Sequence, residues 1–401
     1  MAFPLVVLGA RHRIHARRNH NMNLFKIADD QLEEFLSENV KKYEMNRNYD
    51  WGPENRTNVS NLSHFISHRV VLEYDAVLRT LNRQGYKAAE KFIQEIFWRV
   101  YWKGWLEMRP TVWEDFKRFE IKDDEQDLSN AYNGDTGIDC FDGWVRELRE
   151  TNYLHNHTRM WFASIWIFTL NLSWQSGAAF FLKHLKDGDA ASNTLGWRWV
   201  AGIQTKGKHY LAKSWNIGKF TNGRYANVRL NENADPIEER VNHPIIPPEY
   251  APFNTKRNDS LIIFENDLNF AGREDFYAEY KNVYLVCLDN DQRKFKIANP
   301  VMEFKKSLLH SFQNDVTHPS VITNNFNLIT EKEKSFDVVY PFVGESLDYL
   351  NGIKKELALD ISFLHRRQDL FCINFCNKGF FNFKQNIPRI IEEIKPPIPD
   401  R

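Results

Sequence analysis

Four short clusters of polar and aromatic residues hold most of the side chains in this sequence that could do chemistry. The first comprises Glu95, Trp98, Arg99 and Trp102, whose spacing of i, i+3, i+4 and i+7 places them on one face of a helix. Two indoles beside a carboxylate and a guanidinium are typical of a pocket that stacks an aromatic ligand and hydrogen-bonds its edges. An aromatic core with a Glu–Arg pair at its rim is the alternative, and the residues alone leave both open.

The second cluster reads HNHTRM at 155–160. Asn156 and Met160 share a helical face at i, i+4, and Arg159 lies one step round from them. The two histidines form an HxH pair, but no carboxylate or third ligand stands near them in the sequence, so we expect no metal site.

The third cluster reads DGDAASNTLGWRW at 187–199. Asp189, Asn193 and Trp197 are four residues apart and project along one side of a helix. Asp187 and Asp189 stand at or before its first turn, where carboxylates are favourable. Ordinary helix capping explains the carboxylates as well, whereas the Asn–Trp continuation is unusual for a simple cap.

The fourth cluster reads NRTNVSNLS at 55–63 and is preceded by Tyr43 and Arg47. Hydroxyl, amide and guanidinium groups close to a helix start can cradle a pyrophosphate. Such residues also simply cap helices, so the pattern alone is a weak signal.

The elements that must position these clusters are mainly helices. Apolar residues recur at three- and four-residue spacing through 24–225, and Asp30 is expected to cap the first helix. Five prolines then crowd residues 230–257, which is typical of a crossover between domains.

Beyond this linker the periodicity changes. We expect strands at 260–267, 282–289, 336–342 and 370–375, with helices at 273–280, 301–316 and 346–357 between them. Alternating strands and helices indicate a parallel sheet. The fold class is therefore multidomain: an all-α domain at 24–229, a linker at 230–257 and a Rossmann-like α/β domain at 258–395, with a disordered leader at 1–23 and a tail at 396–401.

Composition limits the classes of function. Lys plus Arg and Asp plus Glu both number 53 in 401 residues, so any contact with nucleic acid must come from a local basic face. No stretch of eighteen apolar residues exists, so we expect no membrane association. Four cysteines make no disulfide framework, which favours a reducing, cytoplasmic location. We also expect a monomer.

Taken in order, the four clusters resemble the flavin-binding helical domain of the photolyase/cryptochrome family. The resemblance covers about residues 40–225 and is carried by NRTNVSNLS, IQEIFWRVYW, TGIDCFDGWVREL, LHNHTRM and KDGDAASNTLGWRW. It implies a bent FAD held in the helical domain. At the FAD diphosphate the resemblance places Tyr43, Arg56, Thr57, Asn58 and Ser60. At the isoalloxazine it places Arg99, Asp189 and an ion pair between Arg159 and Asp187. Asn193 would lie beside the flavin N5.

The resemblance also implies a pocket for a flipped-out cyclobutane pyrimidine dimer in UV-damaged DNA. Its residues would be Arg47, Glu95, Trp98, Asn156, Met160 and Trp199. His157 stands where the family's motif has an arginine expected to contact DNA. Asn193 is the residue of typical photolyases rather than of plant or animal cryptochromes.

Members of this family reduce the flavin through a chain of tryptophans. Trp197 and Trp174 match the proximal and middle positions of that chain. The distal position has no match, because no tryptophan lies between Trp113 and Trp144. Tyr132 or a tryptophan from another helix could replace it.

Family members carry an α/β antenna domain before the helical domain, whereas here the similar segment follows it. SLIIFENDLNFAGRE, VMEFKKSLLHSF and KGFFNFKQNI resemble the opening strand, the first long helix and the closing segment of that domain, which implies a circular permutation. The antenna chromophore, if present, is unidentified. The function implied is a cyclobutane pyrimidine dimer photolyase, a carbon–carbon lyase. A cryptochrome-like blue-light photoreceptor and a flavoprotein without a light function are the alternatives.

Overall fold

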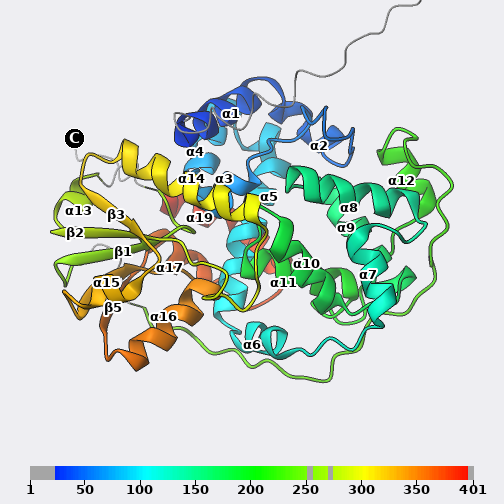
Figure 1. Ribbon diagram of the computed structural model, residues 1–401. Coiled ribbons are helices and arrows are strands. Elements are labelled where there is room, and N and C mark those ends of the chain that lie inside the picture. The colour runs from blue at the N-terminus through cyan, green and yellow to red at the C-terminus, as the bar shows by residue number, and fades with distance from the viewer. Residues whose placement is uncertain (1–22, 251–255, 270–273, 396–401) are drawn as a thin grey trace, which may run out of the picture.

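The structure is a computed structural model that describes residues 23–250, 256–269 and 274–395, a helical region followed along the chain by a parallel sheet with its own helices (Figure 1). The α-helices of the first region are α1 (Leu24–Glu38), α2 (Tyr43–Asn46), α3 (Ser63–Ser67), α4 (Glu73–Gln84), α5 (Tyr86–Glu107), α6 (Thr111–Arg118), α7 (Glu125–Asn133), α8 (Asp139–Thr151), α9 (Asn156–Ser164), α10 (Trp174–His184), α11 (Ala190–Ala201) and α12 (Ser214–Phe220). Two short non-α turns, η1 (Val40–Lys42) and the π-helical η2 (Ile165–Thr169), join them.

Helix starts follow local capping chemistry. Asp189 is the N-cap of α11, and its side chain accepts a hydrogen bond from the Ser192 backbone N–H at 2.8 Å. The prediction that Asp30 caps the first helix is wrong, because Asn23 caps α1 by accepting from the Lys26 N–H at 2.9 Å. Asp30 lies inside α1, where its carboxylate pairs with Lys26 one turn earlier. The remainder of the expected leader, 1–22, and the tail, 396–401, lie outside the described residues.

The second region confirms the expected α/β class. A five-stranded parallel sheet has the order β3-β2-β1-β4-β5. Its elements are β1 (Ser260–Phe264), α13 (Glu274–Ala278), β2 (Asn282–Val286), α14 (Asn299–Asp315), β3 (Ser320–Thr323), α15 (Phe326–Thr330), β4 (Ser335–Val339), α16 (Glu345–Glu356), β5 (Asp360–Leu364), α17 (Arg367–Ile373), α18 (Phe380–Gln385) and α19 (Ile387–Ile394).

The strand at 370–375 is a wrong prediction. This segment belongs to α17 and the turn after it, and β5 lies just before it, while β3 and β5 were not predicted at all. A short apolar run does not distinguish a strand from a buried helical turn. Here Cys372 and Cys376 are both buried at helical spacing. A Cβ on Gly104 of α5 would lie 2.5 Å from the Cys376 sulfur, so α17 packs closely against α5 only because that position is glycine.

The two faces of the sheet pack against different partners. Ile262 and Phe264 of β1 belong to a core with residues of α15 and α16. Leu261 and Ile263, one residue out of phase, belong to a core with α14 and with the helices of the first region. The alternation follows from the two-residue period of a strand. The first region therefore supplies part of the cover that the sheet needs.

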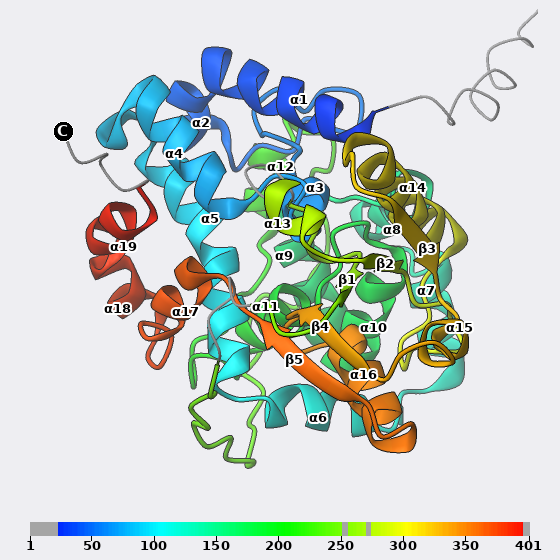
Figure 2. The same cartoon turned by 90° about the vertical axis from the view of Figure 1, so that its left-hand side faces the viewer.

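The C-terminal helices leave the sheet and pack on the first region. Figure 2 shows α17, α18 and α19 beside α4 and α5. Phe383 of α18 is fully buried against Phe97 and Tyr101 of α5. The phenylalanine-rich segment 378–387 thus does not close the α/β domain as expected, because its apolar side chains find their partners on α5.

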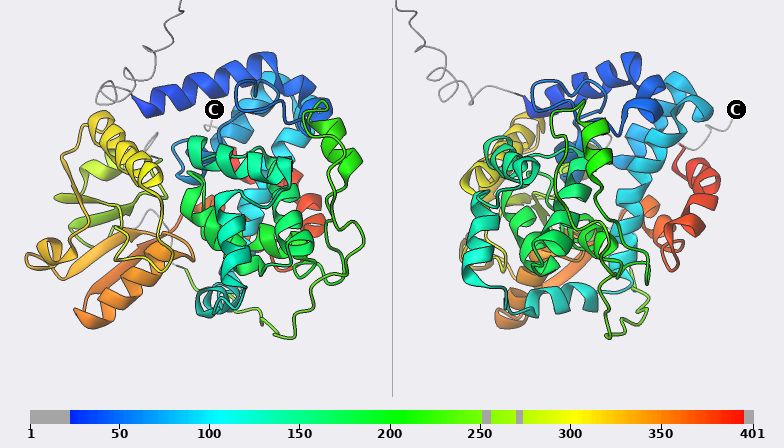
Figure 3. Two further views of the ribbon diagram at one scale, coloured as in Figure 1. Left: turned by 45° about the vertical axis from the view of Figure 1, so that its right-hand side comes forward. Right: turned by 90° about the vertical axis from the view of Figure 1, so that its right-hand side faces the viewer.

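The chain from 221 to 250 contains no helix or strand and runs along the outside of the helical region before the sheet begins (Figure 3). Backbone hydrogen bonds tie it down, with the Ile237 N–H donating to the Ala201 carbonyl at 2.9 Å and the Ile246 N–H to the Met108 carbonyl at 2.8 Å. Within the described ranges, no helix combines the length and the apolar character needed to cross a membrane.

Candidate functional site

A cavity of about 450 Å³ lies among α5, α9, α10 and α11. It falls within the range of about 300–1,000 Å³ that small-molecule sites occupy. All six residues expected at the lesion pocket line it, together with several of those expected around the flavin ring: Arg47, Glu95, Trp98, Asn156, Met160 and Trp199, with Arg99, Arg159, Asp187, Asn193 and Trp197. Residues more than 100 positions apart in the chain therefore converge on one cavity.

Glu95 lies where this cavity meets solvent and pairs with Arg47 at 2.7 Å. The two side chains are 30% and 27% exposed. Burial raises the pKa of Glu95 above its usual value, and the Arg47 guanidinium opposes that shift. Arg99 turns away from Glu95 and pairs with Asp189, so the Glu–Arg pair of the alternative interpretation does not form.

Asp187 forms the deeper charged wall. Its carboxylate lies 2.9 Å from the Arg159 guanidinium and is almost fully buried. Burial by itself would raise its pKa, but Arg159 and Arg99 outweigh that effect and lower the pKa to about 2. The carboxylate is therefore ionised at every physiological pH, and the pair offers a fixed dipole to a ligand.

On the α11 side of the cavity, some polar atoms have a hydrogen-bond partner among the described residues and others have none. Asn193 donates to the Ala178 carbonyl at 2.9 Å. The Ser192 hydroxyl and the Trp197 indole N–H are buried without a hydrogen-bond partner among the described residues. A Cβ on Gly177 of α10 would lie 2.3 Å from the Trp197 ring, so this glycine permits the position of the indole.

Only three of the five residues expected at the diphosphate line a common groove. Arg56, Thr57 and Ser60 line a separate, open groove of about 750 Å³. Tyr153 also lines this groove, with the Arg56 guanidinium 4.6 Å and the Arg159 guanidinium 5.3 Å from its ring centre. Because Arg159 lines the cavity, its contact with Tyr153 links the cavity to the groove.

Asn58 and Tyr43 line neither the groove nor the cavity. Asn58 is buried and donates to the backbone carbonyls of Asn46 and Tyr49 at 2.8 and 2.7 Å. The Tyr43 ring makes edge contacts with Phe35 and Phe92. In this structure both side chains serve the packing around α2.

The HNHTRM segment is held by internal contacts. His155 is the N-cap of α9 and accepts from the His157 N–H at 3.2 Å. The His157 ring is 8% exposed and lies 2.9 Å from the Asn48 carbonyl and 3.2 Å from the Tyr210 hydroxyl. In the described part of the chain no group of three metal-ligating side chains comes together.

The tryptophans expected to carry electrons take different positions. Trp197 lines the cavity, and Trp174 is buried against Phe116 with ring centres 5.5 Å apart. Trp197 also contacts Trp166 at 6.2 Å, and Trp166 contacts Tyr132 at 5.5 Å. Sequence reasoning missed Trp166, because it lies in the π-helical turn η2, outside every cluster.

Sequence reasoning also missed Ser192 and Gly196, which line the cavity. Their spacing of i, i+4 continues to Trp199 and Val200, which is the pattern of one helical face. The same helical spacing, counted back from Val200, would have predicted Gly196 and Ser192 as residues that line the cavity.

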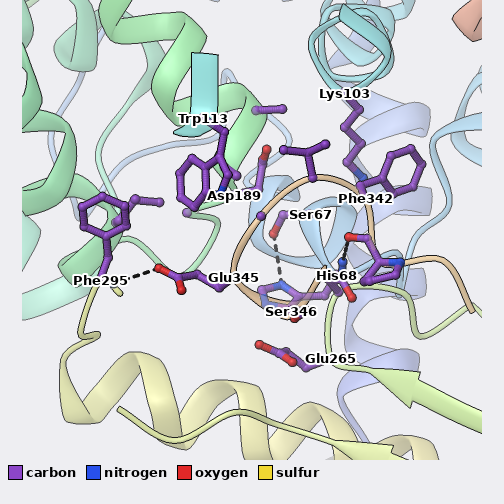
Figure 4. A pocket seen from close by; sticks show the side chains of 18 of the residues that line it. Ser67, His68, Lys103, Trp113, Asp189, Glu265, Phe295, Phe342, Glu345 and Ser346 are labelled. Atoms are coloured by element: carbon purple, nitrogen blue, oxygen red, sulfur yellow. Dashed lines mark hydrogen bonds between the residues drawn. The ribbon is translucent and has the colours of Figure 1, made fainter. Parts of the chain in front are cut away.

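A second, smaller cavity of about 100 Å³ lies where α5 and α11 meet the carboxyl ends of β1 and β4 (Figure 4). Lys103, Asp189, Glu265, Phe342 and Glu345 are among the residues that line it. It is well below the roughly 300 Å³ at which small-molecule sites begin. It therefore does not fit a second chromophore, although doubly wound sheets bind ligands at this edge.

Residues 92–240 match the family model described as the FAD binding domain of DNA photolyase. Over these residues the helical region is similar to the photolyase family. It is 28% identical over 197 residues to a deoxyribodipyrimidine photo-lyase of Vibrio cholerae, covering 47% of this chain and 41% of that protein. A photolyase of the same name from Streptomyces griseus is 34% identical over 149 residues, which cover 36% of this chain and 32% of that protein.

A solved structure of a bacterial class III photolyase from Agrobacterium tumefaciens is also similar, with 28% identity and a TM-score of 0.43 over 49% of this chain and 42% of that one. The chain thus spans about two fifths or less of the length of these curated photolyases.

The residues of this photolyase-type domain fit a flavin. The cavity has aromatic walls, a buried ion pair and two polar atoms, the Ser192 hydroxyl and the Trp197 N–H, that lack partners among the described residues. Buried polar atoms are nearly always hydrogen-bonded, so these two atoms fit a bound molecule with polar edges.

Proposed function

We propose that the protein is a light-driven DNA repair flavoprotein that splits cyclobutane pyrimidine dimers. One observation carries the proposal: the six residues expected to contact a flipped-out dimer line the same cavity as Asp187 and Asn193, which are expected to contact the flavin. A dimer and a flavin in this cavity would lie in direct contact, which is the geometry that electron transfer between them needs.

In this proposal FAD occupies the cavity and extends past Tyr153 into the groove. Arg99, Arg159, Asp187 and Asn193 would hold the ring. Asp189, which lines the smaller cavity and not this one, would act only through its pair with Arg99. Arg56, Thr57 and Ser60 would hold the diphosphate by charge and hydroxyl hydrogen bonds, while Tyr43 and Asn58 would act only through the packing of α2. Reduced FAD, when bound, supplies the light-driven electron, and Trp197 and Trp174 would belong to the route that restores its reduced state.

The protein's own residues would bind and polarise the dimer. Trp98 and Trp199 would pack on the extruded bases, which recovers part of the few kcal/mol that extrusion costs. Asn156 and Met160 would line the part of the cavity that holds the dimer. Arg47 would hold Glu95 in place. Glu95 in its protonated form, which burial favours by raising its pKa, would donate a hydrogen bond to a carbonyl oxygen of the dimer as negative charge develops on it.

We further propose that the α/β region at 258–395 is the family's antenna domain, circularly permuted behind the catalytic domain at 24–229 and the linker at 230–257. Its strand order, in which β1 is flanked by β2 and β4, supports a Rossmann-like assignment. An antenna chromophore is possible but unidentified, and the cavity of about 100 Å³ at the strand ends is too small to be its site.

An absorption spectrum of the purified protein followed by an illuminated repair assay tests the proposal. We expect bound flavin, and restoration of thymines from a dimer-containing oligonucleotide under blue light only. Bound flavin without repair would contradict the enzymatic function and leave the family assignment intact.

A cryptochrome-like photoreceptor is the second candidate, and one observation favours it. His157, which replaces the arginine expected to reach DNA, is almost fully buried and bonded within the protein. It would contribute no phosphate contact and so weaken binding to DNA. Photoreduction of the flavin without any affinity for damaged DNA would favour this function over repair.

A further inference from the structure

Two tryptophans line the cavity where the extruded dimer is expected. Trp98 belongs to α5 and Trp199 to α11. A side chain that is already held in its bound orientation loses no rotational freedom when a ligand arrives, so it binds more tightly than a mobile one. The contacts that hold these two indoles therefore bear on how well the pocket binds.

Phe380 of α18 holds the Trp98 indole. The two rings are stacked, with centres 3.6 Å apart and planes 13° apart. Phe380 is not among the described residues that line the cavity. One face of the indole is thus covered from outside the cavity, and Trp98 meets the cavity with the surface that Phe380 leaves free.

The helix that carries Phe380 is itself anchored on α5. The Tyr101 hydroxyl donates a hydrogen bond to the Lys378 carbonyl at 2.9 Å, just before α18 begins. Phe383, three residues after Phe380, is fully buried and its ring contacts those of Phe97 and Tyr101. Because α18 is fixed on both sides of Phe380, it presents that ring to Trp98 as a rigid surface.

Tyr210 holds the Trp199 indole in a similar way. Their rings are stacked, with centres 6.0 Å apart and planes 25° apart, and Tyr210 does not appear among the described residues around the cavity. The Tyr210 hydroxyl lies 3.2 Å from Nε2 of His157, and Nδ1 of His157 lies 2.9 Å from the Asn48 carbonyl oxygen. Tyr210 is therefore held at its ring and at its hydroxyl.

The carbonyl of Asn48 decides the direction of these hydrogen bonds. Burial lowers the pKa of His157 below its usual value, which favours the neutral ring. A carbonyl oxygen only accepts, so Nδ1 of His157 carries the proton and donates to Asn48. Nε2 is then an acceptor, and the Tyr210 hydroxyl donates to it.

We propose that Phe380 and Tyr210 are positioning residues, which fix the Trp98 and Trp199 indoles in the orientation that stacks on the extruded bases. The inference rests on the proposed function and adds to it two residues that do not themselves line the cavity. Rings locked by surrounding contacts are the support that a precise binding site needs. His157 acts through Tyr210, which gives a use in the pocket to the residue that replaces the family's arginine.

Binding in the dark to a duplex oligonucleotide with one cyclobutane thymine dimer, compared with the same duplex without the dimer, tests the part played by Phe380. Phe380→Leu keeps an apolar side chain without the ring. It should weaken binding to the damaged duplex about 2- to 12-fold, the effect of leaving one side chain mobile, and leave binding to the undamaged duplex unchanged. Phe380→Tyr restores a ring and should bind within about twofold of the wild type. Phe381→Ala, which removes the neighbouring ring that is 74% exposed, is the matched control.

The same comparison tests Tyr210. Tyr210→Leu should lose the preference for the damaged duplex to a similar extent, about 2- to 12-fold. Tyr210→Phe keeps the stack on Trp199 and loses the hydrogen bond to His157, so its affinity should lie between those of Tyr210→Leu and the wild type.

A wild-type ratio of the two affinities in both leucine variants would overturn the inference. Equal losses on both duplexes, or no recovery in Phe380→Tyr, would also overturn it, because they would assign the change to general packing. A wild-type protein that does not prefer the damaged duplex would overturn the proposed function and the inference with it, and that result is visible before any variant is compared.

Discussion

Arg69 and Asp369 form a buried, two-pronged ion pair across 300 positions of the chain, with both nitrogen–oxygen distances at 2.7 Å. Arg69 follows α3, and Asp369 belongs to α17. Arg69 also lies 3.1 Å from Glu73 and 3.2 Å from Asp267, and Arg366 pairs with Asp267. This network joins the helical region, the end of β1 and the C-terminal helices into one cooperative interface.

Asp369→Asn should destabilise the protein by about 3–5 kcal/mol, because removal of one partner leaves a buried charge without full compensation. Urea unfolding followed by circular dichroism measures the loss. Glu392→Gln, which breaks the exposed Lys395–Glu392 pair, should change stability by less than about 1 kcal/mol. Equal effects of the two substitutions would show that the network contributes no more than a surface pair.

Asp187→Asn should weaken flavin retention and destabilise the protein by about 2–4 kcal/mol, because the guanidinium of Arg159 would lose its buried partner. Flavin content after purification and thermal unfolding check the two effects separately. Asp30→Asn, at the exposed Lys26–Asp30 pair, is the control. Full flavin content in Asp187→Asn would remove this carboxylate from the flavin site.

Glu95→Ala should slow repair about 100- to 1,000-fold, the range for loss of one hydrogen bond to a developing negative charge. Flavin content should stay unchanged, because the ion pair of Asp187 and the α11 wall are untouched. Single-turnover repair under saturating light gives the rate, and Glu44→Ala on the exposed side of α2 is the control. Wild-type rates in Glu95→Ala would exclude Glu95 from the mechanism.

Repair should also depend on pH through Glu95. Only the protonated carboxyl donates a hydrogen bond, and burial raises its pKa above the usual 4.5. The rate should therefore be highest below this raised pKa and fall as the pH increases through it. Glu95→Gln keeps a donor at every pH, so its profile should be flat over the same interval. A profile with the same fall in Glu95→Gln would assign the titration to another group.

Gly177→Ala should displace the Trp197 ring, which lines the cavity. The added Cβ would lie 2.3 Å from the Trp197 ring, and overpacking of this kind costs about 1–3 kcal/mol. We expect a lower melting temperature and altered tryptophan fluorescence. Gly352→Ala, where an added Cβ meets nothing within 4 Å, is the helical control and should be neutral or slightly stabilising. An unchanged spectrum in Gly177→Ala would mean that Trp197 moves aside freely.

Helical spacing and motif resemblance sufficed to find most of the cavity from the sequence. Glu95, Trp98 and Trp102 lie on one face of α5, and Asn193 and Trp197 lie on one face of α11. The spacing of residues along a helix is enough to predict this. The all-α and α/β classes were equally readable, since the apolar period changes near residue 258. The sequence does not predict that Arg99 pairs with Asp189 rather than with Glu95, because the partner of a charged side chain depends on which helices meet.

Tertiary structure alone decided how the end of the chain is used. The run at 370–375 has the composition of a strand but forms a helix, because Ile373 and Cys376 pack against Gly104 of α5 and Asp369 pairs with Arg69. The same packing carries Phe380 onto Trp98. No local pattern encodes a contact between residues 282 positions apart; it arises from burial of the apolar faces that α17–α19 and α5 share.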